Sequence, residues 1–394
     1  MEYRSLRSTR GGRFFAQLAL AVALTLVALP IASPSASWAQ SRGGDSVPDL
    51  EAIEKAFIRL AEHVRPSVVV VQTYLTRIVD RETRLRVRFP SSKGTGLIVG
   101  ADGLILTNQH VIQGAEAIQV ILHDQRTFDA TVVSSDPRID LAVLRIDAEH
   151  LRAVTWGDGD SVKVGQWAFA CGNPLGLASR TGRASLTHGI VNGLGRDITR
   201  RIVEPDAEFE MRYYGNLIET TASVHPGSSG GPLFNIKGQV IGIVTAVELS
   251  SHLEATRGFA IPINIHTRRI IDTLMSGGVV RYGFLGVEVT DVASNRPRFV
   301  RGRGSRGARI DRIVLPEGPA ALAGLEAADV VIEFDGVAIE DSDHLVRLVG
   351  FTAVGTEAKI VFLRNRVRYE TVVKLIDRFN TSSRATDPQE QPDY

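Results

Sequence analysis

The hexapeptide GSSGGP, residues 227–232, is the most informative stretch of this 394-residue sequence. It places Ser229 among glycines on a tight turn between two apolar runs. Glycines let the backbone fold closely enough for amide N–H groups to converge beside the hydroxyl, where an acyl oxyanion would form. The donors that we expect are the N–H groups of Gly227 and Ser229. Glycine–serine turns without any chemistry are common, so this segment alone fits both a polar turn and a nucleophile.

A nucleophilic serine needs a base, and the base needs an orienting acid. Residues 94–111 predict two apolar strands joined by an Asp-Gly turn, which deliver His110 at a strand end. Asp140 stands directly before the apolar run that begins at Leu141, where a carboxylate is costly unless it has a partner. Each residue by itself could be structural, as a partly buried histidine or a strand-start cap. Together they predict a catalytic triad of His110, Asp140 and Ser229.

The pattern G-x-S-x-G at 227–231 also matches the nucleophile elbow of α/β-hydrolases. Two features oppose that alternative. The order along the chain is His, Asp, Ser, whereas elbow enzymes run Ser, acid, His, and the flanks predict strand–turn–strand instead of strand–turn–helix. His225 is close to Ser229 in sequence, but a tight turn cannot easily bring it round to act as the base. We interpret it as a loop residue.

The rest of the sequence predicts a mainly β protein. Glycine is plentiful, with 37 residues, and aromatic residues make up only 6%. Short β-type runs with turn residues between them predict an all-β region of one or two barrels across roughly 67–264, followed by a helix at Ile265–Met275. The predicted strands are Val68–Thr73, Gly96–Val99, Leu104–Thr107, Ile118–Leu122, Thr131–Ser134, Ala142–Ile146, Trp167–Cys171, Gly189–Gly193, Leu217–Thr220, Pro232–Phe234, Val240–Ala246 and Gly258–Pro262.

These motifs resemble those of the HtrA/DegP family of trypsin-fold serine proteases. The family's G-T/S-G-F-I…D-G-x-I-L-T-N-x-H-V, D-x-x-x-D-L-A-V-L-K, G-N-P-x-G-L, G-N-S-G-G-P and G-F-A-I-P segments match residues 94–111, 136–145, 172–177, 227–232 and 258–262. The resemblance covers about 60–376. It implies a chymotrypsin/trypsin-like double β-barrel protease domain at 67–280 with the active site between the barrels, a trimeric building block, and ATP-independent cleavage of unfolded or misfolded proteins.

The sequence departs from the family pattern near the nucleophile. Ser228 stands where the family commonly has Asn, and TASVHP at 221–226 replaces the usual D-A-A-I-N-P. These changes leave the triad intact but affect the loop that lines the primary pocket. Val224 suggests a preference for a small or aliphatic side chain at the cleaved residue. Segments 178–186 and 196–216 are longer than usual, and we expect solvated loops there, with a regulatory loop as the alternative.

A second domain is predicted at 283–376. Residues 282–287, YGFLGV, resemble the carboxylate-binding loop of PDZ domains, and the N–H groups of Gly283, Phe284, Leu285 and Gly286 would hold a peptide C-terminus while the peptide adds a strand to the sheet. Residues 316–331 match a further PDZ pattern, with Ala328 where Gly is usual. Helices are expected at 318–323 and 341–349, the second capped by Asp341. A β-rich packing domain without a ligand is the alternative.

Both ends of the chain are predicted to lie outside the folded domains. Basic residues precede an apolar run at 14–31, and cleavage after Ala39 would complete a signal peptide at 1–39. The run is also close to the length of a membrane span, so a retained anchor stays open. Both interpretations place the bulk of the chain outside the cytoplasm, which for the HtrA/DegP resemblance implies the periplasm, with or without an inner-membrane anchor. A linker and amphipathic helix occupy 40–66, with packing or oligomer contact as the helix's role. A disordered tail is expected at 380–394.

The composition and net charge limit the kinds of ligand and partner that we expect. The net charge of +1 gives no field that favours nucleic acid, and no motif implies a metal or any other cofactor. The single cysteine, Cys171, reads as a buried small residue. An arginine-rich segment at 295–309 is interpreted as a solvated loop, or as a contact for an acidic or lipid surface. The intact triad favours an active endopeptidase over the second function class, a chaperone-like or scaffold protein on a protease fold.

Overall fold

The computed structural model describes residues 48–80, 83, 85–203, 209–245, 258–292 and 306–377. The predicted signal or anchor segment 14–31, the cleavage site after Ala39, the tail at 380–394 and most of the arginine-rich segment lie outside these ranges. In the described part of the chain, no helix is long and apolar enough to span a membrane.

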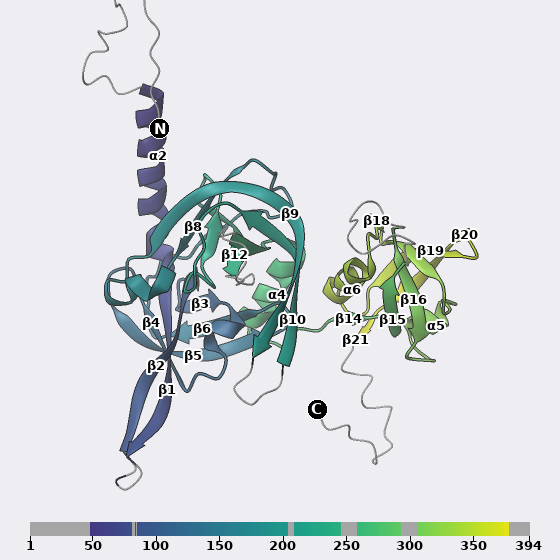
Figure 1. Cartoon of the computed structure of the whole chain (residues 1–394), viewed down its shortest axis with the longest axis horizontal. Coiled ribbons are helices and arrows are strands. Elements are labelled where there is room, and N and C mark those ends of the chain that lie inside the picture. Colours follow the sequence, from purple (N-terminus) through teal and green to yellow (C-terminus); the bar gives the residue numbers. More distant parts are fainter. Residues whose placement is uncertain are drawn as a thin grey trace, which may run out of the picture. The chain divides into compact units, whose positions relative to one another are not determined.

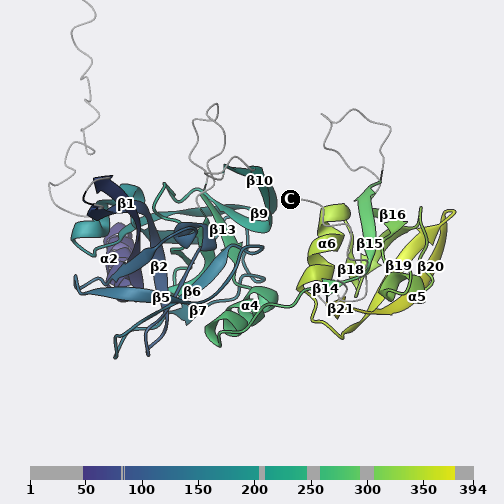
Figure 2. The same ribbon diagram turned by 90° about the horizontal axis from the view of Figure 1, so that it is seen from below.

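The first half of the protease region forms a closed six-stranded barrel (Figures 1 and 2). Its strands are β1 (Val68–Asp80), β2 (Leu85–Gly100), β3 (Leu104–Thr107), β4 (Ala117–Ile121), β5 (Thr127–Asp136) and β6 (Leu141–Ile146), in the order β1-β2-β3-β6-β5-β4. Antiparallel pairing of β1 with β4 closes the ring. Every residue of β3 is buried, because one face of the strand fills the barrel and the other packs in a cluster shared with the second barrel.

The second half forms another ring of six strands (Figure 1). These are β8 (Trp167–Gly172), β9 (Ser185–Val203), β10 (Phe209–Thr220), β11 (Pro232–Phe234), β12 (Gln239–Thr245) and β13 (Gly258–Pro262). Pairing of β11 with both β8 and β12 closes the ring, and the short β7 (Thr155–Trp156) adds to β12 in parallel. Helix α4 (Ile265–Met275) follows. The predicted mainly β, double-barrel fold is confirmed.

The structure corrects one sequence-based prediction in the second barrel. Residues 196–203 and 209–216 were expected to be loop, but they extend β9 and β10 into a long antiparallel ribbon with pairs from Phe209↔Val203 to Tyr214↔Ile198. The sequence did not reveal this ribbon because its charged residues lack the apolar–polar alternation of a half-buried strand. In the same way, β1 and β2 run well beyond the predicted strands into a hairpin.

An N-terminal helix, α2 (Pro48–Val64), ends in a short 3-10 turn, η1 (Arg65–Ser67). From Phe57 onward the helix packs on the second barrel. The ring of Phe57 makes edge contacts with Trp167 and Phe169, and Leu60 and Val64 are buried. For this half of the helix, packing on the next domain is therefore its role in the chain. Oligomer contact stays a separate prediction.

The C-terminal unit has a sheet in the order β15-β16-β17-β19-β20. Its elements are β14 (Gly283–Phe284), β15 (Val287–Asp291), β16 (Ala308–Ile313), α5 (Pro319–Leu322), β17 (Val330–Phe334), β18 (Val337–Ala338), α6 (Ser342–Phe351), β19 (Glu357–Arg364), β20 (Val367–Lys374) and β21 (Ile376–Asp377). Both predicted helices are present, and Asp341 caps α6 by accepting a hydrogen bond from the N–H of His344 at 2.7 Å.

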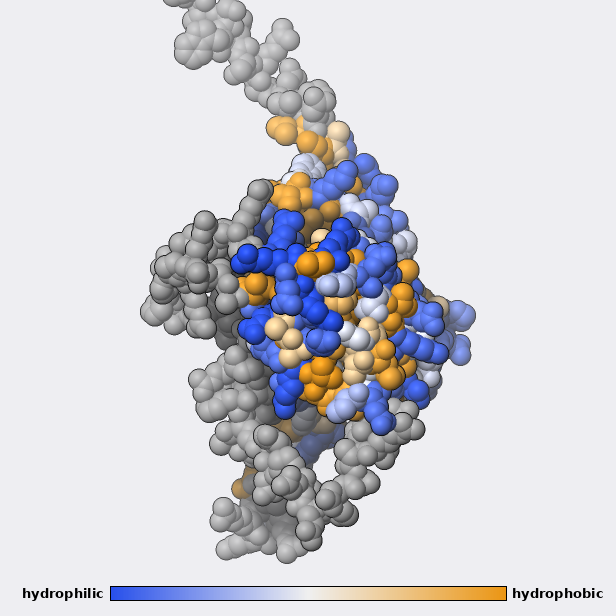
Figure 3. All heavy atoms as spheres, turned by 90° about the vertical axis from the view of Figure 1, so that its right-hand side faces the viewer, coloured by the Kyte–Doolittle hydropathy of each residue, from blue (hydrophilic) through white to orange (hydrophobic). Residues whose placement is uncertain are grey.

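One edge of this sheet carries apolar side chains on its outer surface. Figure 3 turns this unit toward the viewer and shows hydrophobic residues gathered toward the lower half of the face. Leu322 of α5 and Val372 of β20 are 80% and 58% exposed and line a shallow depression. Strand β20 is the edge opposite to β15, so this surface is separate from the groove beside β15 that is described below.

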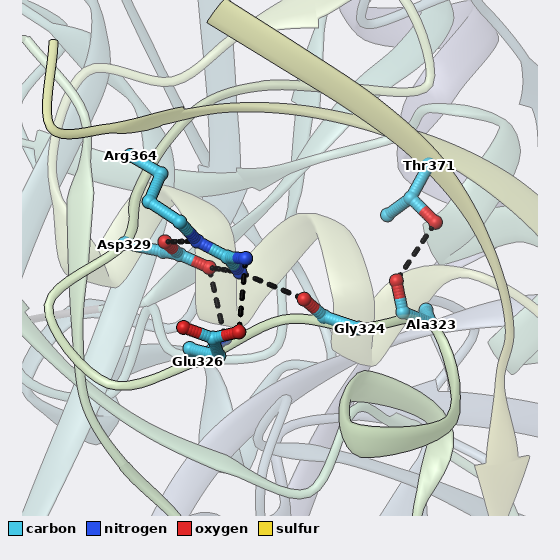
Figure 4. Close-up of polar contacts among 6 residues, drawn as sticks. All are labelled: Ala323, Gly324, Glu326, Asp329, Arg364 and Thr371. Atoms are coloured by element: carbon cyan, nitrogen blue, oxygen red, sulfur yellow. Dashed lines mark hydrogen bonds and ion pairs between the residues drawn. The ribbon is translucent and has the colours of Figure 1, made fainter. Parts of the chain in front are cut away.

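An ion pair between Arg364 and the buried carboxylate of Asp329 fixes the turn between α5 and β17 (Figure 4). The side chain of Arg364 donates from Nε and Nη2 to the two carboxylate oxygens of Asp329, at 2.8 and 2.7 Å. The same guanidinium bonds the carbonyl oxygen of Gly324 and the carboxylate of Glu326. Asp329 is 1% exposed, and its hydrogen bonds raise the pKa of the Arg364 guanidinium above its ordinary value. A permanently charged partner therefore neutralises this buried carboxylate.

Candidate active site

The loop that carries Ser229 is pressed between the two barrels. Ser229 is 5% exposed, and its neighbour Gly230 has a φ of +83°. A Cβ atom at Gly230 would lie 2.2 Å from the carbonyl oxygen of Thr95 and 2.9 Å from the nitrogen of Asn108. Only glycine fits this position, because both its conformation and the available space exclude a side chain. This packing brings Ser229 against the segment that leads into His110.

His110 and Asp140 lie together, as the sequence predicted. His110 Nδ1 lies 2.6 Å from Asp140 Oδ2, and the backbone N–H of His110 donates to Asp140 Oδ1 at 2.9 Å. Asp140 directly precedes β6, as expected, and is 0% exposed. His110 does not lie at the end of β3, as the sequence predicted. It is the second residue of a one-turn helix, α3 (Gln109–Ile112), which begins two residues beyond β3. The turn aims both the ring and the backbone N–H of His110 at one carboxylate.

Further contacts hold Asp140 in place. Its φ of +57° is unusual for a residue other than glycine, and its carbonyl oxygen accepts hydrogen bonds from Asn108 Nδ2 at 2.8 Å and from the Gln109 N–H at 3.2 Å. The hydroxyl of Tyr214 donates to Asp140 Oδ2 at 3.0 Å. Sequence reasoning missed Tyr214, because no motif marks it and it lies in a stretch that was expected to be loop. Its hydroxyl and His110 converge on the same carboxylate oxygen.

The peptide before Gly227 is oriented by a neighbouring turn, η2 (Pro174–Arg180). The N–H of Leu175 donates to the carbonyl oxygen of Pro226 at 2.7 Å. In a trans peptide the C=O and N–H groups point in opposite directions, so the Gly227 N–H points away from η2. Among the described residues no protein acceptor pairs with this N–H. The geometry suits the expected oxyanion donor, since an amide N–H that no protein acceptor uses can bind a substrate oxygen.

Two other residues singled out near the nucleophile have different positions. Val224 is 7% exposed and packs in the core of the second barrel, where a Cβ atom at Gly258 would lie 2.7 Å from Val224 Cγ2. Its role in a primary pocket stays a prediction. His225 lies in the turn, and its carbonyl oxygen accepts the Ser228 N–H at 2.9 Å. This contact is local to the turn, as expected for a loop residue.

Cys171 is not a second nucleophile. The thiol is free and 1% exposed, on β8. Burial raises the pKa of the Cys171 thiol from 9.0 to about 12, so the reactive thiolate is not formed near neutral pH. Across the ranges that the structure covers, no group of three or more His, Cys, Asp or Glu side chains is arranged to hold a metal ion.

The predicted carboxylate-binding loop lies at one end of a groove. Gly283 and Phe284 form β14, Leu285 is buried in the core of this unit, and Gly286 has a φ of +81°. A cavity is lined here by Gly283–Leu285, by Val287 and Val289 of β15, and by Leu345, Val346 and Val349 of α6. In the described part of the sheet β15 is an edge strand, so its outer backbone groups can pair with an added strand.

Comparison with known families agrees with this geometry. Residues 94–243 match the trypsin-like peptidase domain, and residues 283–375 match the PDZ domain. A "Probable periplasmic serine endoprotease DegP-like" of Chlamydia pneumoniae is 33% identical over 355 residues, which cover 82% of this chain and 69% of that protein. The chain belongs to the HtrA/DegP family of serine endoproteases. Its PDZ unit and double barrel follow the order that the family resemblance implied.

Other members of the HtrA/DegP family extend the comparison. A protein of the same description from Halomonas elongata is 38% identical over 274 residues. The match covers 70% of this chain and 54% of that protein, so this chain spans about half the length of the first curated relatives it matches. The structure of the HtrA-type protease AlgW with a decapeptide has a TM-score of 0.64 and 30% identity, and covers 82% of this chain and 98% of that one.

Proposed function

We propose that this chain is an exported, ATP-independent serine endopeptidase that cleaves unfolded or misfolded proteins. One observation supports this more than any other. A buried carboxylate, Asp140, holds the ring and the backbone of His110 beside the loop of Ser229, while the Gly227 N–H on the same loop points away from η2. A base, an orienting acid, a hydroxyl and an oxyanion donor are the parts that acyl transfer needs.

The roles follow from the geometry. Asp140 binds Nδ1 of His110, which leaves Nε2 to take the proton from Ser229 as its Oγ attacks a peptide carbonyl carbon. The N–H groups of Gly227 and Ser229 bind the oxyanion. When the oxyanion collapses, the C–N bond breaks and His110 returns its proton to the leaving amine. Water, deprotonated by His110, then attacks the acyl ester and releases the carboxylic acid together with free Ser229.

Cleavage of β-casein tests this proposal. We expect the chain from Gln40 onward to degrade casein and to react with a fluorophosphonate probe, and a Ser229→Ala copy to do neither. Casein loss with both proteins would assign the activity to another group. Casein loss with neither, even after C-terminal peptides are added, would favour a chaperone-like or scaffold protein. Suppression of casein aggregation by the Ser229→Ala copy would then identify that second class.

The groove between β15 and α6 would bind peptide C-termini. Gly283, Phe284, Leu285 and Gly286 would hold the carboxylate with their N–H groups, and the peptide would add a strand to β15. The structure of AlgW with a decapeptide is consistent with peptide binding in this family. The test is a matched pair of variants, Val346→Lys in the groove and Val372→Lys on the opposite edge, because both valines are 58% exposed. Only Val346→Lys should weaken binding of a fluorescent C-terminal peptide.

Location and assembly complete the proposal. Relatives of this chain are named as periplasmic, and residues 1–39 would direct export, with 14–31 either removed or kept as an anchor. We also propose a homotrimer or a larger assembly. Light scattering of the purified chain from Gln40 tests the second point, and a monomeric mass at micromolar concentration would reject it. Mass spectrometry of the exported protein would show whether the chain begins after Ala39.

A further inference from the structure

Thr95 of β2 lies at the point where the first barrel meets the loop of Ser229. It is 0% exposed, and four hydrogen bonds use its backbone and its hydroxyl. Its N–H donates to the carbonyl oxygen of Ser229 at 2.8 Å. Its Oγ1 donates to the carbonyl oxygen of Gly227 at 2.7 Å and accepts the N–H of Asn173 at 2.9 Å. Its carbonyl oxygen accepts the hydroxyl of Thr107 at 2.7 Å.

These bonds fix the backbone on both sides of the proposed oxyanion donor. The carbonyl oxygen before Gly227 is held by the N–H of Leu175, and the carbonyl oxygen of Gly227 itself is held by Thr95 Oγ1. Gly227 has a φ of +96° and no side chain, so its two flanking peptides are free to rotate unless other groups hold them. Both peptide planes must stay fixed for the Gly227 N–H to keep its direction.

We propose that Thr95 is a positioning residue for the oxyanion hole, and that its hydroxyl fixes the direction of the Gly227 N–H. This inference rests on the proposed protease function. The hydroxyl is suited to the task because it is both a donor and an acceptor. By donating to Gly227 and accepting from Asn173, it joins the nucleophile loop to the turn whose Leu175 holds the other carbonyl oxygen. An aliphatic side chain of the same shape can do neither.

Two substitutions at Thr95 distinguish the effect of its hydroxyl from the effect of its side-chain shape. Thr95→Val keeps the branched shape and removes both bonds, whereas Thr95→Ser keeps the hydroxyl. With labelled casein we expect Thr95→Val to lower kcat by roughly 10- to 100-fold with little change in KM, since a misdirected oxyanion donor affects the transition state most. Thr95→Ser should stay within about threefold of the parent. The affinity for a peptide boronate, which places an oxygen in the hole, should fall in parallel with kcat/KM.

A second buried threonine of the first barrel provides the control. Thr73 is 1% exposed, and its hydroxyl bonds the Ser91 hydroxyl and the Ser92 N–H in the hairpin of β1 and β2. Thr73→Val should therefore keep kcat near that of the parent even if its melting temperature falls. If Thr95→Val does not fold, Thr95→Cys takes its place, because a thiol is a weaker donor and should give a kcat below that of Thr95→Ser.

The outcomes are distinct. A folded Thr95→Val with kcat within threefold of the parent overturns the inference, as does an equal loss of activity in Thr95→Val and Thr95→Ser. A kcat loss without a parallel loss of boronate affinity also overturns it, because the defect would then lie outside the oxyanion hole. A parent that does not cleave casein, with or without C-terminal peptides, overturns the proposed function itself, and this inference with it.

Discussion

Two buried aspartates, one in each functional unit, have partners of different kinds. Asp140 is 0% exposed beside the proposed nucleophile, and its partners are a histidine ring, a tyrosine hydroxyl and a backbone N–H. Asp329 is 1% exposed in the PDZ unit, and its main partner is the guanidinium of Arg364 (Figure 4). Arginine stays charged at every working pH, whereas histidine gains and loses a proton.

Under the proposed mechanism, this difference would distinguish a carboxylate that holds a fold from one that serves a reaction. Arg364 balances the charge of Asp329 at every working pH, so the turn between α5 and β17 does not respond to proton transfer. In the proposed mechanism Asp140 faces His110, which becomes positive when it takes a proton from Ser229. The charge of Asp140 is then available to stabilise the transition state.

Asp140→Asn should give the largest effect. Asparagine tolerates the positive φ of +57° at this position, so the backbone should be kept, while the amide cannot hold His110 in the required tautomer. We expect kcat for casein to fall on the order of 10⁴-fold. Circular dichroism should show a folded protein. A folded variant with more than a tenth of the parent activity would show that Asp140 is structural, like Asp329.

Arg364→Leu tests whether the ion pair with Asp329 stabilises the PDZ unit. It leaves Asp329 buried without its cation, so the PDZ unit should melt earlier, by on the order of 10 °C. The proposed catalytic residues belong to other elements, so hydrolysis of a short peptide substrate below the melting range should be unchanged. Calorimetry and peptide hydrolysis measure the two effects. A drop in kcat without a drop in melting temperature would show that this ion pair has a catalytic role.

Tyr214→Phe tests how much the tyrosine hydroxyl contributes to holding Asp140. The change removes only the hydroxyl that donates to Asp140 Oδ2, while the ring remains buried. Losing one hydrogen bond of about 1 kcal/mol should lower kcat roughly fivefold. Steady-state kinetics with casein measures it, and Tyr282→Phe is the matched control, because the hydroxyl of this buried tyrosine donates to a different aspartate, Asp136. An unchanged kcat would mean that His110 alone is enough to hold the carboxylate.

Cys171 shows what a buried ionisable group does without a partner. Burial raises the pKa of its thiol to about 12 in the folded protein, so folding favours the protonated form. The stability that this contributes is complete below pH 9 and is lost as the pH rises from about 9 toward 12, amounting to about 1 kcal/mol by pH 10. The parent should therefore lose more stability than Cys171→Ala over this range. Urea unfolding measures the two unfolding free energies, and an equal loss in both proteins between pH 8 and pH 10 would contradict this pKa shift.

The sequence was sufficient for residues whose chemistry requires a local motif, and insufficient for those that depend on distant contacts. The glycines around Ser229 and the apolar strands before His110 and after Asp140 are short patterns that predicted a β region of one or two barrels, and the family resemblance implied two. Tyr214 reaches Asp140 across 74 positions, with no local signal at either end. The long ribbon of β9 and β10 was missed for a similar reason, because pairing between backbones needs no particular side chains.

The smallest effect is expected at Ala328, where the sequence pattern of PDZ domains usually has glycine. Ala328 has a φ of +75°, in the left-handed region that costs an L-residue about 1 kcal/mol. Ala328→Gly relieves this strain but adds freedom to the unfolded chain, so the unfolding free energy of the PDZ unit should rise by no more than about 1 kcal/mol. Because Ala328 directly precedes Asp329, Ala328→Gly in the Arg364→Leu background shows whether the ion pair compels the strained turn. Equal gains in both backgrounds would mean that the turn adopts this conformation without the pair, whereas a gain confined to the parent would mean that Arg364 enforces it.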